Sequence, residues 1–294
     1  MGCRVCDFGQ GSAHIFIDAY QRAVYWSRDC HGYLYIKLFF FANFEVDDRS
    51  DAGSNVVAND GNGVTGVNES RVLASDLNFV SSELGKLGYN TGSYQGFTHY
   101  SKSNKGIVKL DWNINDNNSF SLKYTMLRSS ADIPASNSGS INSSNGRRPG
   151  VTALPFFGSG YVINNNADIL IGELNTRFSN SANNKLQIGF TQLRDFRSSL
   201  SAGNFPQVDI LDGNGLPYTT FGYERFTYGN VLNTDVVQLN NIFNLYKGKH
   251  EFTFGTQNSF KKYSNGFSPS YAGAFRFNSL ADFYASANGT KAAA

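Results

Sequence analysis

The residues best suited to binding a metal ion lie close to the amino terminus. Cys3, Cys6 and Cys30 are the three cysteines of the chain, and His14 and His31 lie near them. Cys3 and Cys6 have the Cys-x-x-Cys spacing of many zinc sites, but neither a second such pair nor a His-x-x-x-His pair follows. We therefore interpret the cysteines as unpaired thiols, and we predict that the chain binds no metal ion and no cofactor.

The rest of the sequence offers little for catalysis. His99 and His250 are isolated, and there is no nucleophile elbow and no phosphate-binding loop. Arg147 and Arg148 precede a proline, and this basic pair suits either an anionic ligand or a solvated loop. The turn Asp-Gly-Asn-Gly at 212–215 lacks the full set of ligands of a calcium loop. We predict that the protein is not an enzyme.

The composition favours a β-rich protein with few charges. Of the 294 residues, 16% are charged and 15% are aromatic, and the formal net charge of +2 gives no reason to expect a nucleic-acid partner. No run approaches the roughly 18 apolar residues that a membrane-spanning helix needs. A membrane β-barrel remains compatible with this, because alternating strands never produce a long apolar run. A secreted, β-rich adhesin has a similar composition.

The clearest structural pattern is a hairpin over residues 105–130. Apolar and polar residues alternate on both sides of a turn at 115–118, so each arm is a strand with one apolar and one polar face. Each arm has about the ten residues that a tilted strand needs to cross a bilayer. Taken alone, the hairpin is also typical of a soluble sandwich or barrel. The residues that alternate onto the apolar face of the two arms are Val108, Leu110, Trp112, Ile114, Phe120, Leu122, Tyr124 and Met126.

The same alternation predicts five further strands and two further tight turns. A helix is expected in the long segment before the hairpin, because leucine and valine recur there at helical spacing, with Asn68 or Ser70 as its cap and Gly88 at its end. A short capped segment follows at 278–284. The further strands cover 33–46, 167–179, 184–196, 234–246 and 250–263, and the further turns lie at 180–184 and 247–249.

The lengths of the connections favour an outer-membrane barrel over a soluble sandwich. Short turns alternate with long loops at 47–104, 131–166 and 198–233. In an up-and-down meander, alternate connections lie at the same end, so all long loops are expected on one side, as in barrels of the outer membrane. Aromatic residues near the short turns are expected to form an interfacial girdle: Trp112, Phe120, Phe178, Tyr246 and Phe252.

Four stretches resemble a known family. They are KLFFFANFE at 37–45, SRVLASDL at 70–77, GKHEFTFGTQNSF at 248–260 and FNSLADF at 277–283. Together they are similar to the barrel of TonB-dependent receptors, in particular the Oar-like receptors of the Bacteroidetes type. The resemblance covers about residues 37–284. It implies an outer-membrane transporter that imports a scarce nutrient with energy from a TonB–ExbB–ExbD complex.

The fold expected is all-β: an antiparallel up-and-down meander that forms a partial transmembrane β-barrel of about seven strands, against about 22 in a complete transporter of this kind. We divide the chain into an unassigned head at 1–32, not native to the family, and a partial outer-membrane barrel at 33–294. Signal peptide, plug and TonB-contacting segment are not recognised in it. We therefore expect an internal fragment of the barrel, located in the cell outer membrane.

Two functions are consistent with the sequence. The first is part of a TonB-dependent receptor that imports a siderophore, an oligosaccharide or a peptide, in contact with outer-membrane lipid. The second is a surface-exposed β-rich protein that binds or adheres through its loops without transport. In the first, the candidate lumen-facing residues are Lys109, Asp111, Lys123, Glu173, Arg177, Gln187 and Glu251. The candidate substrate contacts are the loop aromatics Tyr218, Phe221, Tyr223, Phe226 and Tyr228.

Overall fold

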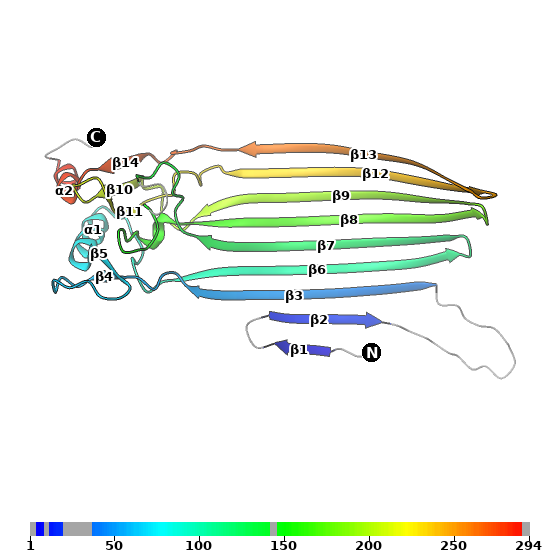
Figure 1. Ribbon diagram of the computed structural model, residues 1–294, viewed down its shortest axis with the longest axis horizontal. Coiled ribbons are helices and arrows are strands. Elements are labelled where there is room, and N and C mark those ends of the chain that lie inside the picture. Colours follow the sequence, from blue (N-terminus) through cyan, green and yellow to red (C-terminus); the bar gives the residue numbers. More distant parts are fainter. Residues whose placement is uncertain (1–3, 9–11, 20–36, 142–145, 290–294) are drawn as a thin grey trace.

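The computed structural model describes residues 4–8, 12–19, 37–141 and 146–289. It consists of one long antiparallel sheet and a small α/β cap at one end of that sheet (Figure 1). Neither described helix is long and apolar enough to cross a membrane.

Seven long strands form an up-and-down meander, in which every neighbouring pair is antiparallel. The predicted fold class is confirmed, and the sheet stays open, since β13 pairs only with β12 among the described residues. The strands are longer than predicted at the loop end, because backbone pairing continues after the apolar alternation has stopped. They are β3 (Leu38–Ala52), β6 (Thr98–Asn115), β7 (Asn118–Ile133), β8 (Tyr161–Ser179), β9 (Ala182–Ser199), β12 (Val231–Lys247) and β13 (His250–Gly266).

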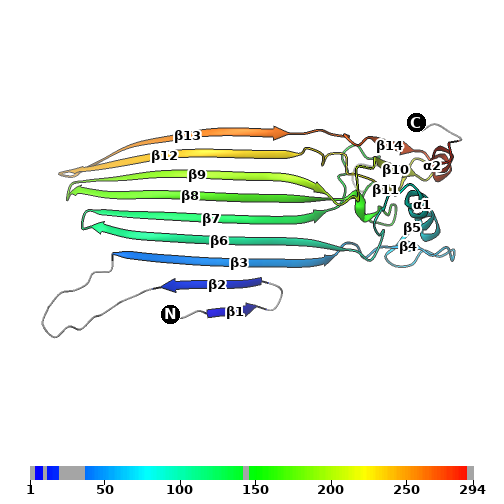
Figure 2. The ribbon, with the colours of Figure 1, turned by 180° about the vertical axis from the view of Figure 1, so that it is seen from behind.

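The connections of this sheet are strongly asymmetric, as predicted. At one end, tight turns join β6 to β7, β8 to β9 and β12 to β13. The last of these turns contains Gly248 with a φ of +64°, a conformation that glycine adopts without strain. At the other end, segments 53–97, 134–160 and 200–230 connect the long strands, and all of their described residues lie at the same end of the sheet (Figure 2).

Part of the amino-terminal head extends the sheet, which the sequence did not predict. Strand β1 (Arg4–Phe8) pairs with β2 (Ser12–Ala19), and β2 pairs with β3, both antiparallel, so that the sheet has nine strands. Cys3, Cys30 and His31 lie outside the described residues. The division of the chain at residue 32 stays a prediction.

The long loops do not lie separately on the surface but fold together into the cap. Together with the tail that follows β13, they contribute a three-stranded sheet in the order β11-β10-β14, a two-stranded sheet, two α-helices and a 3-10 turn. These elements are β4 (Val57–Asn59), β5 (Glu69–Leu73), α1 (Ala74–Lys86), η1 (Phe157–Ser159), β10 (Gln207–Leu211), β11 (Pro217–Phe221), β14 (Ala274–Phe277) and α2 (Leu280–Ala287).

The cap has its own hydrophobic core, drawn from all the loop segments and the tail. It is the main cluster of fully buried apolar side chains in the described chain. Burying these side chains offsets the entropy cost of ordering four long segments. The core comprises Ala58, Val72, Leu77, Val80, Leu84, Tyr89, Leu154, Phe156, Val208, Ile210, Tyr218, Phe221, Phe277 and Phe283.

Helix α1 confirms the predicted helix but not the residues predicted to cap its amino terminus. The apolar spacing is correct, since Leu77, Val80 and Leu84 are buried, and Gly88 follows the helix with a φ of +76°. The N-cap residue of the helix is Leu73, which makes no capping hydrogen bond through its side chain. Asn68 and Ser70 are unsuitable, because Asn68 has a φ of +59° and Ser70 belongs to β5, which runs directly into the helix. At α2, Ser279 does cap the helix by accepting a hydrogen bond from the Asp282 N–H.

Candidate functional site

One face of the long sheet carries apolar side chains in continuous rows across neighbouring strands. The pairing register aligns Ala42, Val108, Tyr124, Leu170, Phe190, Val237 and Phe260 in one row, and Phe40, Leu110, Leu122, Gly172, Ile188 and Leu239 in the next. Most of these side chains are exposed, including Ile188 at 54% and Phe260 at 66%. In water such a surface would be a large apolar patch, so it is built for a lipid environment.

The apolar face has the height of a bilayer core. On β12 it extends from Val237 to Leu245, with Asn241 as the one polar residue between them. At about 3.3 Å per residue this is roughly 26 Å, close to the apolar band of outer-membrane barrels. Trp112, Phe120, Phe178 and Phe252 lie on this face near the short turns, as predicted. Tyr246 does not, because its register partner is Glu251 and both belong to the opposite face.

Charged pairs mark the limit of this band on the side of the cap. The guanidinium of Arg128 binds both carboxylate oxygens of Asp168 on the next strand at 2.8 Å. The guanidinium of Arg194 binds one carboxylate oxygen of Asp235 on the next strand at 2.7 Å. Each arginine also donates to the carbonyl of its own preceding residue and to one carbonyl of the neighbouring strand. These pairs lie on the apolar face, one to two rows beyond the row of Tyr124 and Val237, at the end of the apolar band that is nearer the cap.

The opposite face of the sheet is mainly polar and carries all seven candidate lumen residues, although Phe39, Phe41, Ile171 and Ile242 also lie on it. The register places Asp111, Ser121, Glu173, Gln187, Asn240 and Gln257 in one row. Lys109 and Lys123 face each other in the adjacent row, and Arg177 and Glu251 follow on the same face toward the short turns. That this face lines a lumen stays a prediction.

The polar face is held together by its own contacts. Glu173 receives the ammonium of Lys185 at 2.8 Å and the amide of Gln187 at 3.3 Å, and Lys109 pairs with Asp111 at 2.8 Å. Near the short turns the face forms a hollow of about 1100 Å³ lined mainly by asparagine side chains. Neutral amides both donate and accept, so this surface suits a hydrogen-bonding partner or water.

The cap corrects the role expected for two of the loop aromatics. Phe221 is fully buried in the cap core, and Tyr218 is 8% exposed. The hydroxyl of Tyr218 donates to Asp76 at 2.6 Å and accepts the Leu73 N–H at 3.0 Å. Burial, together with the Asp76 carboxylate, raises the pKa of Tyr218, which keeps this donor protonated. Both residues therefore have a structural role.

The other three loop aromatics lie nearer the surface. Tyr223, Phe226 and Tyr228 are partly exposed, and the ring of Tyr228 stacks on Tyr271 at a centroid distance of 3.6 Å. Substrate contact stays a prediction for these three residues.

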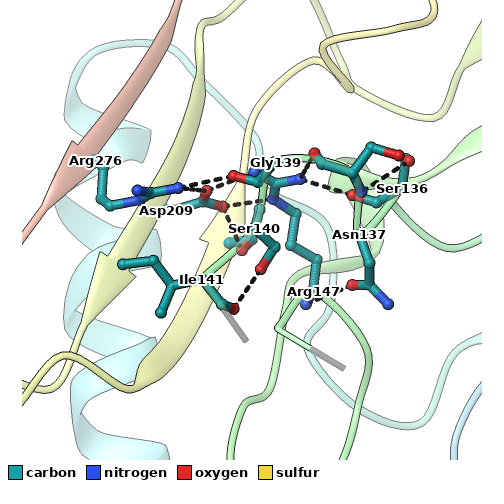
Figure 3. Close-up of polar contacts among 10 residues, drawn as sticks. Ser136, Asn137, Gly139, Ser140, Ile141, Arg147, Asp209 and Arg276 are labelled. Atoms are coloured by element: carbon teal, nitrogen blue, oxygen red, sulfur yellow. Dashed lines mark hydrogen bonds and ion pairs between the residues drawn. The ribbon is translucent and has the colours of Figure 1, made fainter. Parts of the chain in front are cut away.

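Arg147, expected on a loop surface, forms the most buried ion pair of the cap. Its side chain is 1% exposed, and it binds both carboxylate oxygens of Asp209 at 2.7 and 2.8 Å (Figure 3). Its remaining terminal nitrogen donates to the carbonyls of Ser136 and Ser138. Neither predicted role, anion binding or a solvated charge, fits a guanidinium that is buried and fully paired. A fork-shaped pair of this kind fixes the loop to β10.

A second ion pair ties β5 to the turn at 212–215. Arg71 binds Asp212 at 2.9 Å, while the other carboxylate oxygen of Asp212 accepts the N–H groups of Asn214 and Leu216. Burial opposes the ionised form, but these two N–H donors and the Arg71 guanidinium together lower the pKa of Asp212. The carboxylate therefore stabilises the turn and is not free to bind an ion.

Sequence reasoning missed the partners that make the cap. The local pattern of apolar residues gives no role to Asp76, Asp209 or Arg71, because each acts on a loop segment far away in the chain. His99 lies at the base of the cap between Phe97 and Phe157, at centroid distances of 5.4 and 5.9 Å. This packing supports a structural role for that histidine.

Comparisons with known proteins agree with this architecture. A family model described as an outer membrane beta barrel domain matches residues 70–293. The structure is similar to the outer membrane transporter YddB from Escherichia coli, with a TM-score of 0.50 and 11% identity over 86% of this chain and 25% of that chain. It is also similar to the siderophore receptor PiuA from Acinetobacter baumannii, with a TM-score of 0.27 and 9% identity over 88% of this chain and 43% of that chain.

No curated protein matches the sequence. The chain spans about a quarter of the length of YddB, and at this identity the likeness concerns the fold alone. The family match covers most of the chain, and the exposed apolar band agrees with it. The chain therefore belongs to the outer membrane beta-barrel domain family and is located in the outer membrane.

Proposed function

We propose that the chain is part of a TonB-dependent receptor that imports a scarce nutrient across the outer membrane. The observation that carries the proposal is the order of three features along the sheet. An apolar band as high as a bilayer core is followed by charged pairs, and these are followed by a folded cap built from every long connection. A plain pore has no need of such a cap, whereas a receptor must hold a solute outside the membrane before moving it.

The polar face supplies the second element of the proposal. In a closed barrel the face opposite to the lipid faces the lumen, and here it carries paired charges and many amides. The fold, which is like that of an outer membrane transporter, is compatible with this proposal. We propose outer-membrane lipid, a small imported solute and a TonB–ExbB–ExbD complex as the partners. Neither a catalytic step nor a nucleic-acid partner belongs to this function.

Uptake with and without TonB tests the proposal. The full-length protein would be produced in otherwise isogenic cells that contain or lack TonB, and each would receive labelled siderophores, oligosaccharides and peptides. We expect accumulation of one class inside the cells only when both the protein and TonB are present. Uptake that is equal without TonB would contradict the proposal.

The alternative function is binding at the cell surface without transport. The folded cap favours it to the same extent as transport, because a stable outer surface is what an adhesin presents. In the same experiment this alternative predicts surface-bound label in both strains and no accumulation in either.

A further inference from the structure

Buried hydrogen-bond donors without acceptors gather in the cap around β10 and β14. The Nε atoms of Arg225 and Arg276 are buried and have no hydrogen-bond partner among the described residues. Gln207 is 1% exposed, and neither the nitrogen nor the oxygen of its side-chain amide has a hydrogen-bond partner among the described residues. A buried donor without an acceptor has lost its hydration without gaining a hydrogen bond, so such a cluster calls for a missing partner.

The register brings these groups to one place. Strands β10 and β14 pair in parallel, with Gln207 opposite Ala274 and Asp209 opposite Arg276, so Gln207, Asp209 and Arg276 share one face of the three-stranded sheet. The guanidinium of Arg276 donates to the Gly139 carbonyl at 2.9 Å (Figure 3). The Nη1 atom of Arg225 lies 3.3 Å from the position of a Cβ on Gly139. Both guanidinium groups thus converge on Gly139.

The charges at this place do not balance. Asp209 is the carboxylate at the centre, and Arg147 occupies both of its oxygens. Arg276 lies 3.9 Å from Asp209, at the limit of an ion pair, and its side chain is 39% exposed. Arg225 has no carboxylate within ion-pair distance among the described residues. The neighbouring Glu224 turns away, binding the Phe226 N–H and the Thr227 hydroxyl and lying 3.9 Å from Arg197.

Gly139 is suited to this position by its backbone. Its φ of +70° is a conformation that glycine adopts without strain, and any side chain would press against the Arg225 guanidinium. The absence of a side chain at Gly139 therefore lets the Arg225 guanidinium approach the loop closely.

We propose that Arg225 and Arg276, flanking Gly139, bind an oxyanion group of a small solute, either a carboxylate or a phosphate. Guanidinium forks match the planar carboxylate and the phosphate oxygens through paired charge-assisted hydrogen bonds. The proposal rests on the proposed function and narrows it, since the solute held by the cap would be an anion. Arg147 remains the structural member of the group, because its donors already have acceptors.

Binding of simple anions by the full-length protein in detergent micelles tests the proposal. Inorganic phosphate and citrate would be titrated separately, with chloride at matched ionic strength as the control, and the dissociation constants measured by calorimetry. We expect saturable binding of at least one of the two anions. Binding of phosphate alone assigns a phosphate group to the solute, and binding of citrate alone assigns a carboxylate. Heat that is not saturable, or is equal in chloride, would overturn the proposal.

Variants locate the binding. Arg225→Gln and Arg276→Gln should each weaken binding of the anion at least tenfold, which corresponds to about 1.4 kcal/mol, because each removes a charge-assisted pair. Arg225→Lys keeps the charge and the fold but loses the fork, and it should weaken binding to a smaller extent. Arg49→Gln, at an exposed arginine of β3, is the matched control and should bind as the unchanged protein does. Equal affinity in all four variants would overturn the assignment.

The experiment is independent of the transport test. It needs no TonB and no cell, so anion binding without uptake would leave this site in place and contradict only transport. Uptake of an uncharged solute without any anion binding would contradict the anion site and leave the transport proposal in place.

Discussion

The sheet and the cap use the same apolar residue types in opposite ways. In the cap, Phe221 is fully buried against other rings, and Leu77, Val80 and Leu84 are buried beneath α1. In the sheet, Phe260 is 66% exposed, with Val237 opposite it on β12. The cap excludes water by folding on itself, whereas the sheet leaves its apolar face for the membrane to cover. Burial within the chain thus separates the region that lies in water from the region that lies in lipid.

The same substitution in both regions should have very different effects. Phe221→Ala leaves a cavity in the cap core, and we expect it to cost about 3–5 kcal/mol of cap stability. Phe260→Ala removes a ring that no core surrounds, so the cap should be unaffected. Amide hydrogen exchange of the full-length protein in micelles would measure the stability of the cap in both variants. Equal protection of the cap in the two variants would show that the described core does not stabilise it.

A charge on the lipid face should cost less, but should act on insertion. Leu122→Arg places a cation near the middle of the apolar band, and we expect a loss of roughly 2–4 kcal/mol. Lys123→Leu, on the next residue and the opposite face, should cost much less. Folding titrations into lipid vesicles would compare the two. Similar costs for both variants would mean that the two faces are wrongly assigned.

The smallest expected effect is the pH dependence of the turn at 212–215. The folded pKa of Asp212 is lowered, so its contribution is fully present above the ordinary pKa of about 3.9 and is lost as pH falls through the folded value. The unfolding temperature of the cap should fall across this acidic range. The difference in unfolding temperature between the unchanged protein and Asp212→Asn isolates the contribution of this carboxylate. That difference should shrink toward zero at low pH. A difference that is constant with pH would contradict the role of this carboxylate.

The sheet could be predicted from the sequence because its information is local. Alternation along 105–130 determines which residues share a face, and the short turns determine the register. For this reason all seven residues predicted on the polar face do lie on one face. Tyr246 was misplaced because it was chosen for its distance from a turn and not for its parity.

The cap could not be predicted because its contacts join segments far apart in the chain. Arg147 and Asp209, or Asp76 and Tyr218, come from different loops, and no pattern within either loop relates them. Helix α1 was the exception, since its apolar spacing is visible within a single segment. The aromatic residues of 218–228 were expected at a surface because nothing in their own segment shows what covers Phe221.

The central claim is that one face of the long sheet contacts lipid. Single spin labels placed along β12 from Val236 to Leu245, in the full-length protein in vesicles, would report their accessibility to oxygen, which partitions into lipid, and to a water-soluble nickel chelate. We predict a period of two, with oxygen favoured at positions 237, 239, 243 and 245 and disfavoured at 238, 240 and 244. An absence of alternation, or the opposite phase, would contradict the claim.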